Sequence, residues 1–532
     1  MTRATIDHRE VEVREGSTIL DAARALGIDI PTLCHLEGRK PQTSCMVCMV
    51  KVGDPGRLLP ACGTRVQDGM QVESETEEVA VARRAALELL LSDHAGDCLA
   101  PCQSICPAHM NIPVMIRQIA AGQFREALMT AKEHIALPAV LGRICTKPCE
   151  KGCRRCGHDS AVSVCLLKQV AADEDLAEEE PYLPEQKPAR GKKVAIIGTG
   201  PAGLAAAYYL LQEGYACTLF DDHELPGGML RFGVTEDRLP RAVLDGEIRI
   251  IEKLGAEFRL GVRVGEQVSF EEIRKGFDAV LIAAGELDPP GAAQLGFGGT
   301  AQGVRSGGIA ADSRTYATAL DGVFAAGGAV RKSRLSVRSV AEGREAAGSI
   351  VQYLGGLPVA RRAEPFNHRL VQVAPIEVMR MASGASSAER VVPGAGAVRG
   401  FTREEAQLEA GRCLGCDCRK LGDCRLRAYA QRYGADSHRF KGERRQIEVY
   451  RQQAGVIFEP GKCISCGLCI QITEDAREPL GLTFIGRGFS VRVGVPFNRT
   501  LEEGLQKVAE EVVAVCPTGA LAFADRTRLC LP

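Results

Sequence analysis

The sequence predicts a multidomain protein that combines α/β and α+β domains. Its 532 residues exceed the usual size of a single domain. Residues 194–203, VAIIGTGPAG, join a β-branched strand to a glycine turn and a helix, which is typical of a Rossmann-like domain. The 22 cysteines fall in tight groups before and after this segment. Such groups indicate further small domains that hold metal centres.

The glycine turn predicts a dinucleotide site. The turn contains Gly198, Gly200, Pro201, Ala202 and Gly203. Its glycines let the backbone approach a pyrophosphate, whose charge is stabilised at the N-terminus of the helix over 204–211. The next strand, 216–220, leads to Asp221, about twenty residues downstream of the turn, where a ribose hydroxyl needs an acceptor. A glycine-rich turn in an ordinary α/β domain would leave this acid unexplained.

Composition and charge exclude several classes of partner. The net charge of −1 gives no electrostatic basis for binding nucleic acid or an anionic membrane. The first residues are too polar for a signal peptide, and no uncharged apolar run is long enough for a membrane span. We therefore expect a cytoplasmic chain, in which grouped cysteines are metal ligands rather than disulfides.

Residues 1–78 contain the first cysteine group: Cys34, Cys45, Cys48 and Cys62. Alternating segments and a short helix over 19–26 surround a cysteine-rich loop. Four thiolates in one loop-rich segment suit zinc or a [2Fe–2S] centre. The words PTLC, SCMVC and LPAC closely resemble the N-terminal [2Fe–2S] domain of the large iron–sulfur subunit of complex I. The resemblance implies a β-grasp fold that holds [2Fe–2S], with zinc as the alternative.

Residues 79–175 begin with an amphipathic helix over 82–91 and continue with two further cysteine groups. The words PCQSICP, GRIC and KPCEKGC resemble the helical domain of the glutamate synthase small subunit, which dihydropyrimidine dehydrogenase shares and which holds two [4Fe–4S] clusters. The ligands of those clusters interleave. The resemblance assigns Cys98, Cys102 and Cys153 to one cluster and Cys106, Cys145 and Cys149 to the other.

Each of these two sets lacks one ligand. For the first, His94 precedes Cys98 with the H-x3-C spacing by which a histidine ligates a [4Fe–4S] cluster in the complex I subunit; the alternative is a surface histidine at a helix end. Imidazole in place of thiolate tends to raise the cluster potential. For the second, the family supplies Glu or Gln where this chain has Lys168, whose ammonium cannot ligate iron. We expect Cys165, on the same helix face, to replace it, with Cys156 as second choice.

Residues 176–192 form a charged, proline-rich linker, and residues 193–355 follow as the nucleotide domain. The words PGGMLRFG, GFDAVLIAAG and GVFAAGG again resemble the glutamate synthase small subunit, in its FAD-binding half. The resemblance favours FAD over NAD and adds as cofactor-binding residues Gly227, Gly228, Met229, Arg231, Gly285, Gly327 and Gly328. The family normally has Asp where Gly328 stands, and losing that carboxylate would weaken or alter FAD binding.

A second nucleotide domain is absent from its expected place. In the family, a Rossmann domain for NADPH lies between the motifs that correspond to GFDAVLIAAG and GVFAAGG. Here only the 36 residues 286–321 separate Gly285 from Gly322. A nucleotide-binding βαβ unit with its returning strands does not fit in that length, and the stretch, which includes GFGGT at 296–300, has no second fingerprint. We expect a flavin domain without an NAD(P)H site in the usual place.

The remaining residues predict two more cluster sites after a linker over 356–400. Residues 401–445 contain Cys413, Cys416, Cys418 and Cys424, a spacing that suits one [4Fe–4S] cluster better than zinc. Residues 446–532 resemble a bacterial ferredoxin that keeps one of its two clusters. The expected ligands are Cys463, Cys466, Cys469 and Cys516, while Thr473 stands where a ligand of the lost cluster would be.

One FAD, one [2Fe–2S] and four [4Fe–4S] centres on one chain predict an electron wire. No hydrolytic or lyase constellation stands out, so we assign no catalytic residue. We expect an oxidoreductase that acts as an electron-transfer subunit of a larger complex and connects an NAD(P)H-oxidising flavoprotein, a hydrogenase, a formate dehydrogenase or a similar partner to a ferredoxin or other acceptor. This set of centres is also compatible with flavin-based electron bifurcation. The alternative function is a self-sufficient NAD(P)H-dependent reductase of the glutamate synthase small subunit type. A further alternative is structural zinc at some of the cysteine sets.

Overall fold

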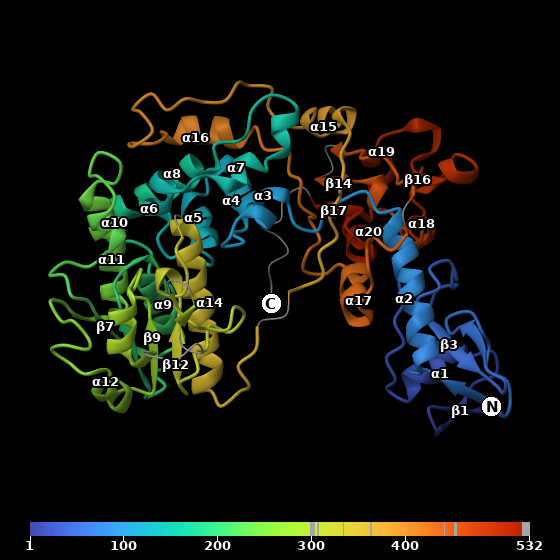
Figure 1. Cartoon of the computed structure of the whole chain (residues 1–532). Coiled ribbons are helices and arrows are strands. Elements are labelled where there is room, and N and C mark those ends of the chain that lie inside the picture. Colours follow the sequence, from blue (N-terminus) through green and yellow to red (C-terminus); the bar gives the residue numbers. More distant parts are fainter. Residues whose placement is uncertain are drawn as a thin grey trace. The chain divides into compact units, whose positions relative to one another are not determined.

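The computed structural model describes residues 1–297, 304–305, 308–333, 335–361, 364–440, 442–451 and 455–523. It divides the chain into two compact units (Figure 1). The first unit consists of Met1–Ala100, Glu364–Gly384 and Gly415–Pro532, and the second of Pro101–Ala363 and Ala385–Leu414. Each unit therefore combines segments that are far apart in the sequence. No helix among the described residues is long and apolar enough to cross a membrane.

The N-terminal part of the first unit is a mixed sheet covered by a helix. Its elements are β1 (Thr2–Ile6), β2 (Arg9–Val13), α1 (Ile19–Ala25), β3 (Met49–Val52), β4 (Arg57–Pro60), β5 (Met70–Glu73) and α2 (Glu77–Ser92). The strand order is β2-β1-β5-β3-β4, with β1 and β5 parallel and the other pairs antiparallel. A capping box between Thr18 and Asp21 starts α1. Ile19 and Leu20 then lie fully buried against the sheet.

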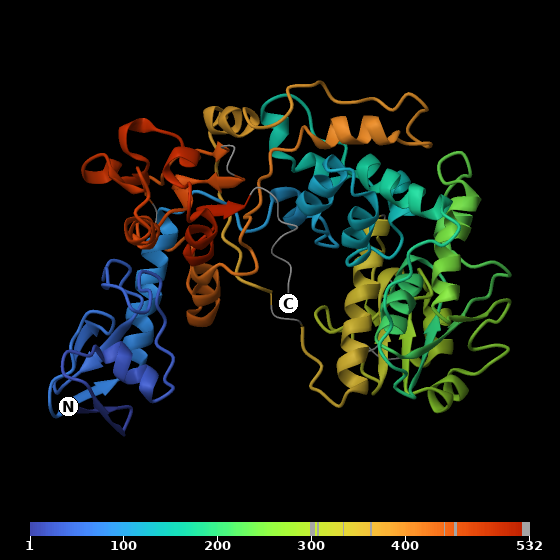
Figure 2. The same cartoon turned by 180° about the vertical axis from the view of Figure 1, so that it is seen from behind.

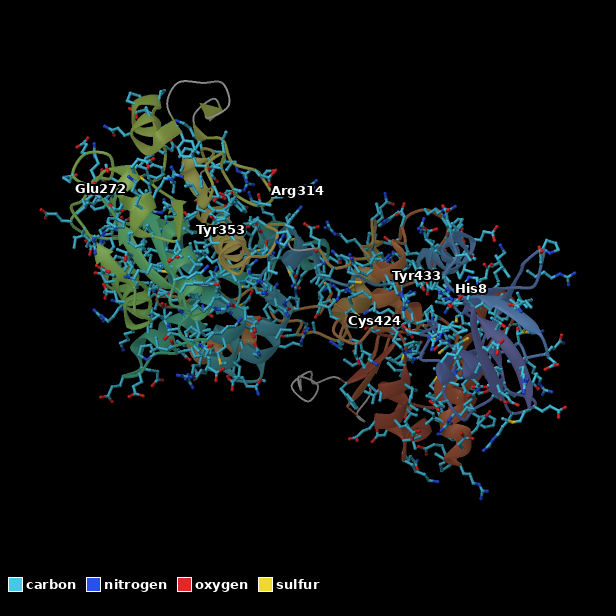
Figure 3. All side chains as sticks on the ribbon, turned by 90° about the horizontal axis from the view of Figure 1, so that it is seen from below. His8, Glu272, Arg314, Tyr353, Cys424 and Tyr433 are labelled. Atoms are coloured by element: carbon cyan, nitrogen blue, oxygen red, sulfur yellow. The ribbon has the colours of Figure 1, made fainter. Side chains whose placement is uncertain are left out.

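The C-terminal part of the same unit is built around a small antiparallel sheet. Its elements are α15 (Pro375–Ala382), α17 (Arg425–Tyr433), β13 (Tyr450–Arg451), β14 (Val456–Phe458), η4 (Pro460–Lys462), α18 (Leu468–Asp475), β15 (Thr483–Ile485), η5 (Gly488–Ser490), β16 (Arg492–Gly494), η6 (Pro496–Asn498), α19 (Leu501–Gly504), α20 (Ala509–Val515) and β17 (Leu521–Phe523). Strand β14 pairs with β13 and β17, and α18 packs on α20. Helix α17 packs on α2, where Arg83 donates to the Tyr433 hydroxyl over 2.8 Å. Tyr433 is labelled in Figure 3.

Residues 501–515 form two helices, α19 and α20, although the apolar pattern over 501–513 predicts a single helix. A capping box of Thr500 and Glu503 begins α19. The carboxylate of Glu478 then accepts the N–H groups of Lys507 (2.6 Å) and Val508 (3.1 Å), which starts α20. Because this acceptor comes from a residue some thirty positions upstream, local periodicity does not reveal the break.

The helical part of the second unit packs into one core with the nucleotide domain. Its elements are α3 (Pro101–Ile105), α4 (Ile112–Ala120), α5 (Phe124–Lys132), α6 (Pro138–Ile144), α7 (Pro148–Lys151), η1 (Arg154–Gly157), α8 (Val164–Ala177) and α16 (Arg403–Ala410). Helix α16 comes from much later in the sequence and packs on α4 and α8. Its residues Ala406 and Ala410 belong to the same buried cluster as the residues of α4 and α8.

The nucleotide domain is a parallel sheet with helices on both faces (Figure 2). Its elements are β6 (Lys193–Ile197), α9 (Pro201–Gln212), β7 (Ala216–Phe220), α10 (Met229–Phe232), α11 (Arg241–Lys253), β8 (Glu257–Arg259), α12 (Phe270–Gly276), β9 (Ala279–Ile282), α13 (Pro289–Ala292), η2 (Ala293–Phe297), β10 (Val304–Arg305), β11 (Gly308–Ile309), β12 (Val323–Ala325), η3 (Gly327–Ala329) and α14 (Ser336–Leu354). The strand order is β12-β9-β6-β7-β8. Every pair in this sheet is parallel.

Alternate residues of the central strand β6 serve the two faces of this sheet. Val194 and Ile196 belong to the core that contains α9 and α14. Ala195 and Ile197 belong to the opposite core, which includes Phe270 of α12. The apolar run that predicted a buried strand therefore reflects burial on both faces, as expected for a parallel strand.

The described part of 286–321 contains no strand of this parallel sheet. It holds the short helix α13, the π turn η2 and the hairpin β10–β11. Residues 298–303 and 306–307, which include most of the glycine-rich stretch, lie outside the described residues. Among the described residues there is thus one parallel sheet, and it carries one glycine fingerprint.

A buried ion pair joins the helical part to the nucleotide domain within the second unit. Lys132 Nζ lies 3.1 Å from Glu247 Oε2, and both side chains are almost fully buried. Glu247 also accepts the N–H of Ala139 over 2.7 Å. Burial raises the pKa of Glu247, while Lys132 partly opposes this shift.

We predict that Lys132→Met destabilises the protein by about 3–5 kcal/mol, because it leaves the Glu247 carboxylate buried without a counter-charge. Chemical denaturation of the holoprotein measures this effect. The matched control is the double variant Lys132→Met/Glu247→Leu, which we expect to recover most of the loss. Equal destabilisation in the single and double variants would contradict this explanation.

Candidate functional site

The glycine motifs of the nucleotide domain meet at the carboxyl ends of β6 and β9. A Cβ placed on Gly203 would lie 2.0 Å from the Gly198 carbonyl oxygen, so the third glycine is required where the turn folds back on itself. Gly198 has φ +107° and lies against the backbone of Ala283. Gly200 is the N-cap of α9, and its Cβ position faces open space. The turn thus leaves room for a phosphate at the start of α9.

The other two glycine motifs lie against this turn. The turn and these two motifs together are called the glycine cradle below. Gly228, with φ +48°, would place a Cβ 2.9 Å from the Cα of Gly200. Gly328 would place one 3.0 Å from the carbonyl carbon of Gly285. Each motif therefore approaches another through backbone that has no side chain, as the glycines of dinucleotide-binding folds do. The residues present fit such a cofactor.

Helix α14 packs against both the first and the last glycine motif of the cradle. A Cβ on Gly343 would lie 2.2 Å from the carbonyl oxygen of Ala202 in α9. Gly327, just after β12, donates its N–H to Glu342 Oε2 of α14 over 3.1 Å. The close approach of α14 to α9 thus holds the first and the last glycine motif together.

Asp221 directly follows β7, as expected. Both of its carboxylate oxygens form hydrogen bonds within the nucleotide domain. Its Oδ2 accepts the N–H and the hydroxyl of Thr199, at 2.7 and 2.6 Å. Its Oδ1 accepts the N–H of His223 and contacts the imidazole at 2.9 Å. Burial raises the pKa of Asp221, but these hydrogen bonds outweigh burial and hold the pKa below its usual value. Sequence reasoning missed Thr199 and His223, although the first x of G-x-G-x-x-G and the second position after the acid are the places to look.

Two other expected cofactor residues have different environments. Arg231 is buried, donates to the Pro226 carbonyl over 2.6 Å and pairs with Asp245. Met229 begins α10 and is 69% exposed. Arg231 thus fixes the loop 226–232, and Met229 is available to a ligand or partner.

The four cysteines of residues 1–78 come together. The Cys45 and Cys62 thiols both donate to Cys34, which lowers the pKa of Cys34. Cys62 also donates to Cys48, which lowers the pKa of Cys48. All four side chains are buried. One compact set of four thiols in a loop-rich region fits a [2Fe–2S] centre.

The ferredoxin-like residues form a second set around a cavity. The cavity is lined by Phe458, Cys463, Ile464, Cys466, Gly467, Leu468, Cys469, Val493, Cys516, Pro517, Thr518, Ala520 and Leu521. All four expected ligands face this one apolar space. Thr473, which stands in place of a further cysteine, is buried and hydrogen-bonds the Ile470 carbonyl and the Leu482 N–H. It therefore packs as a structural residue.

A third set gathers in the helical part of the second unit. The Cys145 thiol donates to Cys165, and Cys165 donates to Cys149. Cys106 joins them around the buried ammonium of Lys168, where the four thiolates outweigh burial and raise the pKa of Lys168. Cys156 is exposed, with its Sγ 3.6 Å from the Glu150 carbonyl oxygen. Cys165 thus lies among Cys106, Cys145 and Cys149, and the Lys168 ammonium lies beside this set.

The remaining expected ligands do not gather as the sequence motifs suggest. Cys98 belongs to the first unit, together with Cys416, Cys418 and Cys424. Cys102, Cys153 and Cys413 belong to the second unit and pack against its core. Both the 94–106 motif and the 413–424 motif are therefore divided between units.

His94 is buried in the first unit, not at the surface. Its exposed fraction is 7%, and its Nδ1 has no hydrogen-bond partner among the described residues. Its ring meets that of His368 edge to face at 5.3 Å. Burial lowers the pKa of His94, so its imidazole is neutral, the form that ligates metal.

Three segments of the chain match family models. Residues 1–77 match a 2Fe-2S iron–sulfur cluster binding domain. Residues 76–180 match dihydropyrimidine dehydrogenase domain II with its 4Fe-4S cluster, and residues 196–258 match an NAD(P)-binding Rossmann-like domain. The predicted order of an iron–sulfur domain, a helical cluster domain and a Rossmann-like domain is confirmed. The described cysteines are free thiols.

Similar proteins include several subunits of oxidoreductases. The chain is 42% identical over 190 residues to the NADPH-Fe(3+) oxidoreductase subunit beta of Geobacter sulfurreducens, covering 35% of this chain and 28% of that protein. It is 41% identical over 207 residues to the NADP(+)-dependent formate dehydrogenase subunit beta of Moorella thermoacetica, covering 35% and 29%. It is 30% identical over 234 residues to the glutamate synthase [NADPH] small chain of Bacillus subtilis, covering 42% and 46%. The chain thus spans less than half the length of each of these three relatives.

We predict that Gly343→Ala weakens flavin retention and lowers stability by roughly 1–3 kcal/mol, because its methyl group meets the Ala202 carbonyl. The matched control is Gly348→Ala on the same helix, where nothing lies within 4 Å of the added methyl group. That change should be neutral or stabilising by up to about 1 kcal/mol. Flavin absorbance per chain and thermal unfolding measure both. Similar behaviour of the two variants would rule out close packing of α14 on α9.

We predict that Cys165→Ala removes about four iron atoms per chain, because it takes one thiolate from the set around Lys168. Cys156→Ala, the second choice from the sequence, should keep its iron. Iron and acid-labile sulfide are measured after anaerobic purification of each variant. Loss of iron in Cys156→Ala with retention in Cys165→Ala would reverse the assignment.

Proposed function

We propose that this chain is an iron–sulfur flavoprotein that transfers electrons as a subunit of a multi-subunit oxidoreductase complex. It relays electrons between a catalytic or NAD(P)H-oxidising partner and a ferredoxin or a second enzyme. The single observation that carries the proposal is that several thiol sets lie next to one another in space within the first unit. Such a series of sets suits electron transfer and does not serve substrate binding.

The neighbouring sets are linked through specific residues. Burial raises the pKa of Cys466 to about 12, and the nearby charge of Cys34 adds to the shift. Cys34 and Cys466 also belong to one buried cluster. Burial raises the pKa of Cys424 to about 12, with contributions from Cys418, Cys98 and Cys516. The set around Cys34, the set around Cys466 and the set around Cys424 are therefore successive neighbours.

The proposed cofactors are FAD, one [2Fe–2S] and four [4Fe–4S] centres. FAD, when bound, exchanges two electrons as a hydride or passes them singly, so it converts between the two kinds of donor. The glycine cradle supports a dinucleotide, and the resemblance of its three motifs favours FAD over NAD(P). Buried thiols without disulfides support a reducing, cytoplasmic location.

The proposed partners follow from what the described residues lack. Between Gly285 and Gly322 they hold no second nucleotide fold, so an NAD(P)H-oxidising flavoprotein is the natural donor. The names of the similar proteins support this, since two of them are beta subunits of larger enzymes. A hydrogenase or a formate dehydrogenase is an equally suitable catalytic partner.

One observation favours a second function, that of a self-sufficient NAD(P)H-dependent oxidoreductase. Residues 196–258 match an NAD(P)-binding Rossmann-like domain. If this cradle takes NAD(P)H, the chain has its own electron donor and needs no partner to supply electrons.

We predict that neither NADH nor NADPH bleaches the flavin of the purified chain under anaerobic conditions, whereas dithionite does. The reason is that the one glycine cradle is taken by FAD. Flavin and cluster absorbance are followed together after each addition. Rapid reduction by either nucleotide would favour the second function, and the Gly343→Ala variant then serves as the control with a damaged cradle.

A further inference from the structure

Two cysteine motifs that look contiguous in the sequence are divided at complementary places. The chain passes from the first unit to the second between Ala100 and Pro101, so Cys98 and Cys102 lie in different units. It returns to the first unit for the last time between Leu414 and Gly415, which separates Cys413 from Cys418 in the same way. One cysteine of each motif therefore lies apart from the rest of its motif.

In the first unit, Cys98 lies beside Cys418. The backbone N–H of Cys418 donates to the Cys98 carbonyl oxygen over 3.1 Å, and the N–H of Cys98 donates to the carbonyl of His368 over 3.0 Å. Gly519 faces the same place, because a Cβ there would lie 2.3 Å from Cys418 Sγ. The glycine thus leaves space at the Cys418 sulfur that any other residue would fill.

Cys424 faces the same region from the start of α17. Its Sγ lies 3.8 Å from the carbonyl oxygen of Pro517, which also accepts the N–H of Leu426 over 3.2 Å. The charges of Cys418 and Cys98 act on Cys424. Pro517 and Gly519 belong to one short loop, so this loop contacts Cys424 and Cys418 together. Three thiols therefore converge in the first unit, and one of them comes from more than three hundred residues upstream.

In the second unit, Cys413 is held close to Cys153. Cys413 follows α16, and its neighbour Arg412 donates to the Ser160 carbonyl over 2.9 Å. Arg155 donates to the Arg412 carbonyl. The thiol of Cys153 accepts the N–H of Val162, in the same 160–162 segment, and the charge of Arg412 acts on that thiol.

The end of α16 is thereby fixed to the segment that follows Cys153. Glu409 accepts the N–H of Ser163 over 2.7 Å and pairs with Arg412 at 2.9 Å, with both side chains fully buried. Cys102, Cys153 and Cys413 all pack on the core of this unit. Buried, charge-satisfied contacts of this kind fix a backbone position firmly.

We propose that the two motifs exchange one ligand each. Cys98, Cys418 and Cys424 hold one [4Fe–4S] cluster in the first unit, and Cys102, Cys153 and Cys413 hold another in the second unit. The exchange rests on the proposed iron–sulfur content but not on the proposed donor, acceptor or direction of electron flow. Each cluster then joins segments that are hundreds of residues apart within one unit, so metal loading and the folding of that unit are coupled.

The test uses alanine variants of the full-length chain, purified anaerobically. Cys418→Ala identifies the low-temperature electron paramagnetic resonance (EPR) signal of one cluster, and Cys102→Ala identifies that of the other. We expect Cys98→Ala to lose the signal that Cys418→Ala loses, and Cys413→Ala to lose the one that Cys102→Ala loses. Each variant should contain about four iron atoms fewer than the wild type.

The exchange is overturned if Cys98→Ala and Cys102→Ala lose the same signals, or if Cys413→Ala and Cys418→Ala do. Cys424→Ala and Cys153→Ala replace Cys418→Ala and Cys102→Ala if either variant fails to fold, and an intact [2Fe–2S] signal reports folding. Cys156→Ala, at an exposed cysteine, is the matched control and should keep every signal. Iron and sulfide in the wild type test the proposed function separately, since a wild type without clusters would refute that function before any variant is compared.

Discussion

Buried thiols lie close together in the cysteine-rich parts of this protein, and their mutual approach limits how those parts can fold. In the N-terminal domain, the thiols of Cys34 and Cys62 are in direct contact inside a folded core. Neighbouring thiolates repel one another, and burial makes each charge more costly. Iron placed between them lowers both penalties, because it binds the thiolates and offsets part of their charge. We therefore expect the fold of each such region to depend on the metal centre that its thiols would bind.

The same constraint explains the charged residues buried near these sets. Lys168 is buried beside four thiolates and partly balances their charge. Lys462 is buried beside Cys418 and pairs with Glu459 at 2.7 Å. A buried ammonium without such neighbours would be strongly unfavourable. Each lysine is thus understandable only together with the cysteine set next to it, and the ionic state of both depends on the cluster.

Local features of the sequence predicted much of the fold. The strand over 216–220 is β7, the helix over 204–211 lies within α9, and the four cysteines of residues 1–78 meet as expected. These features are encoded within short segments by period, glycine and spacing. The strand and helix follow from local backbone preferences, and the thiol set follows from a loop that closes on itself.

Features that depend on distant segments could not be predicted. The division between Leu414 and Gly415 arises because α16 packs on α4 and α8, which lie more than two hundred residues upstream. Gly328 stands where the family that this chain resembles has Asp. Its packing against Gly285 becomes visible only when strands β9 and β12 lie side by side. The spacing of cysteines likewise says which could share a cluster, but tertiary packing decides which do.

The most direct test of the chain as a multi-centre iron–sulfur flavoprotein is its cofactor content after anaerobic purification. Iron, acid-labile sulfide, zinc and flavin are measured per chain in one preparation. We expect about 18 iron atoms, a similar amount of sulfide and one FAD, with no zinc above background. Zinc in place of iron at the cysteine sets, or a chain without flavin, would contradict the electron-transfer function at its root.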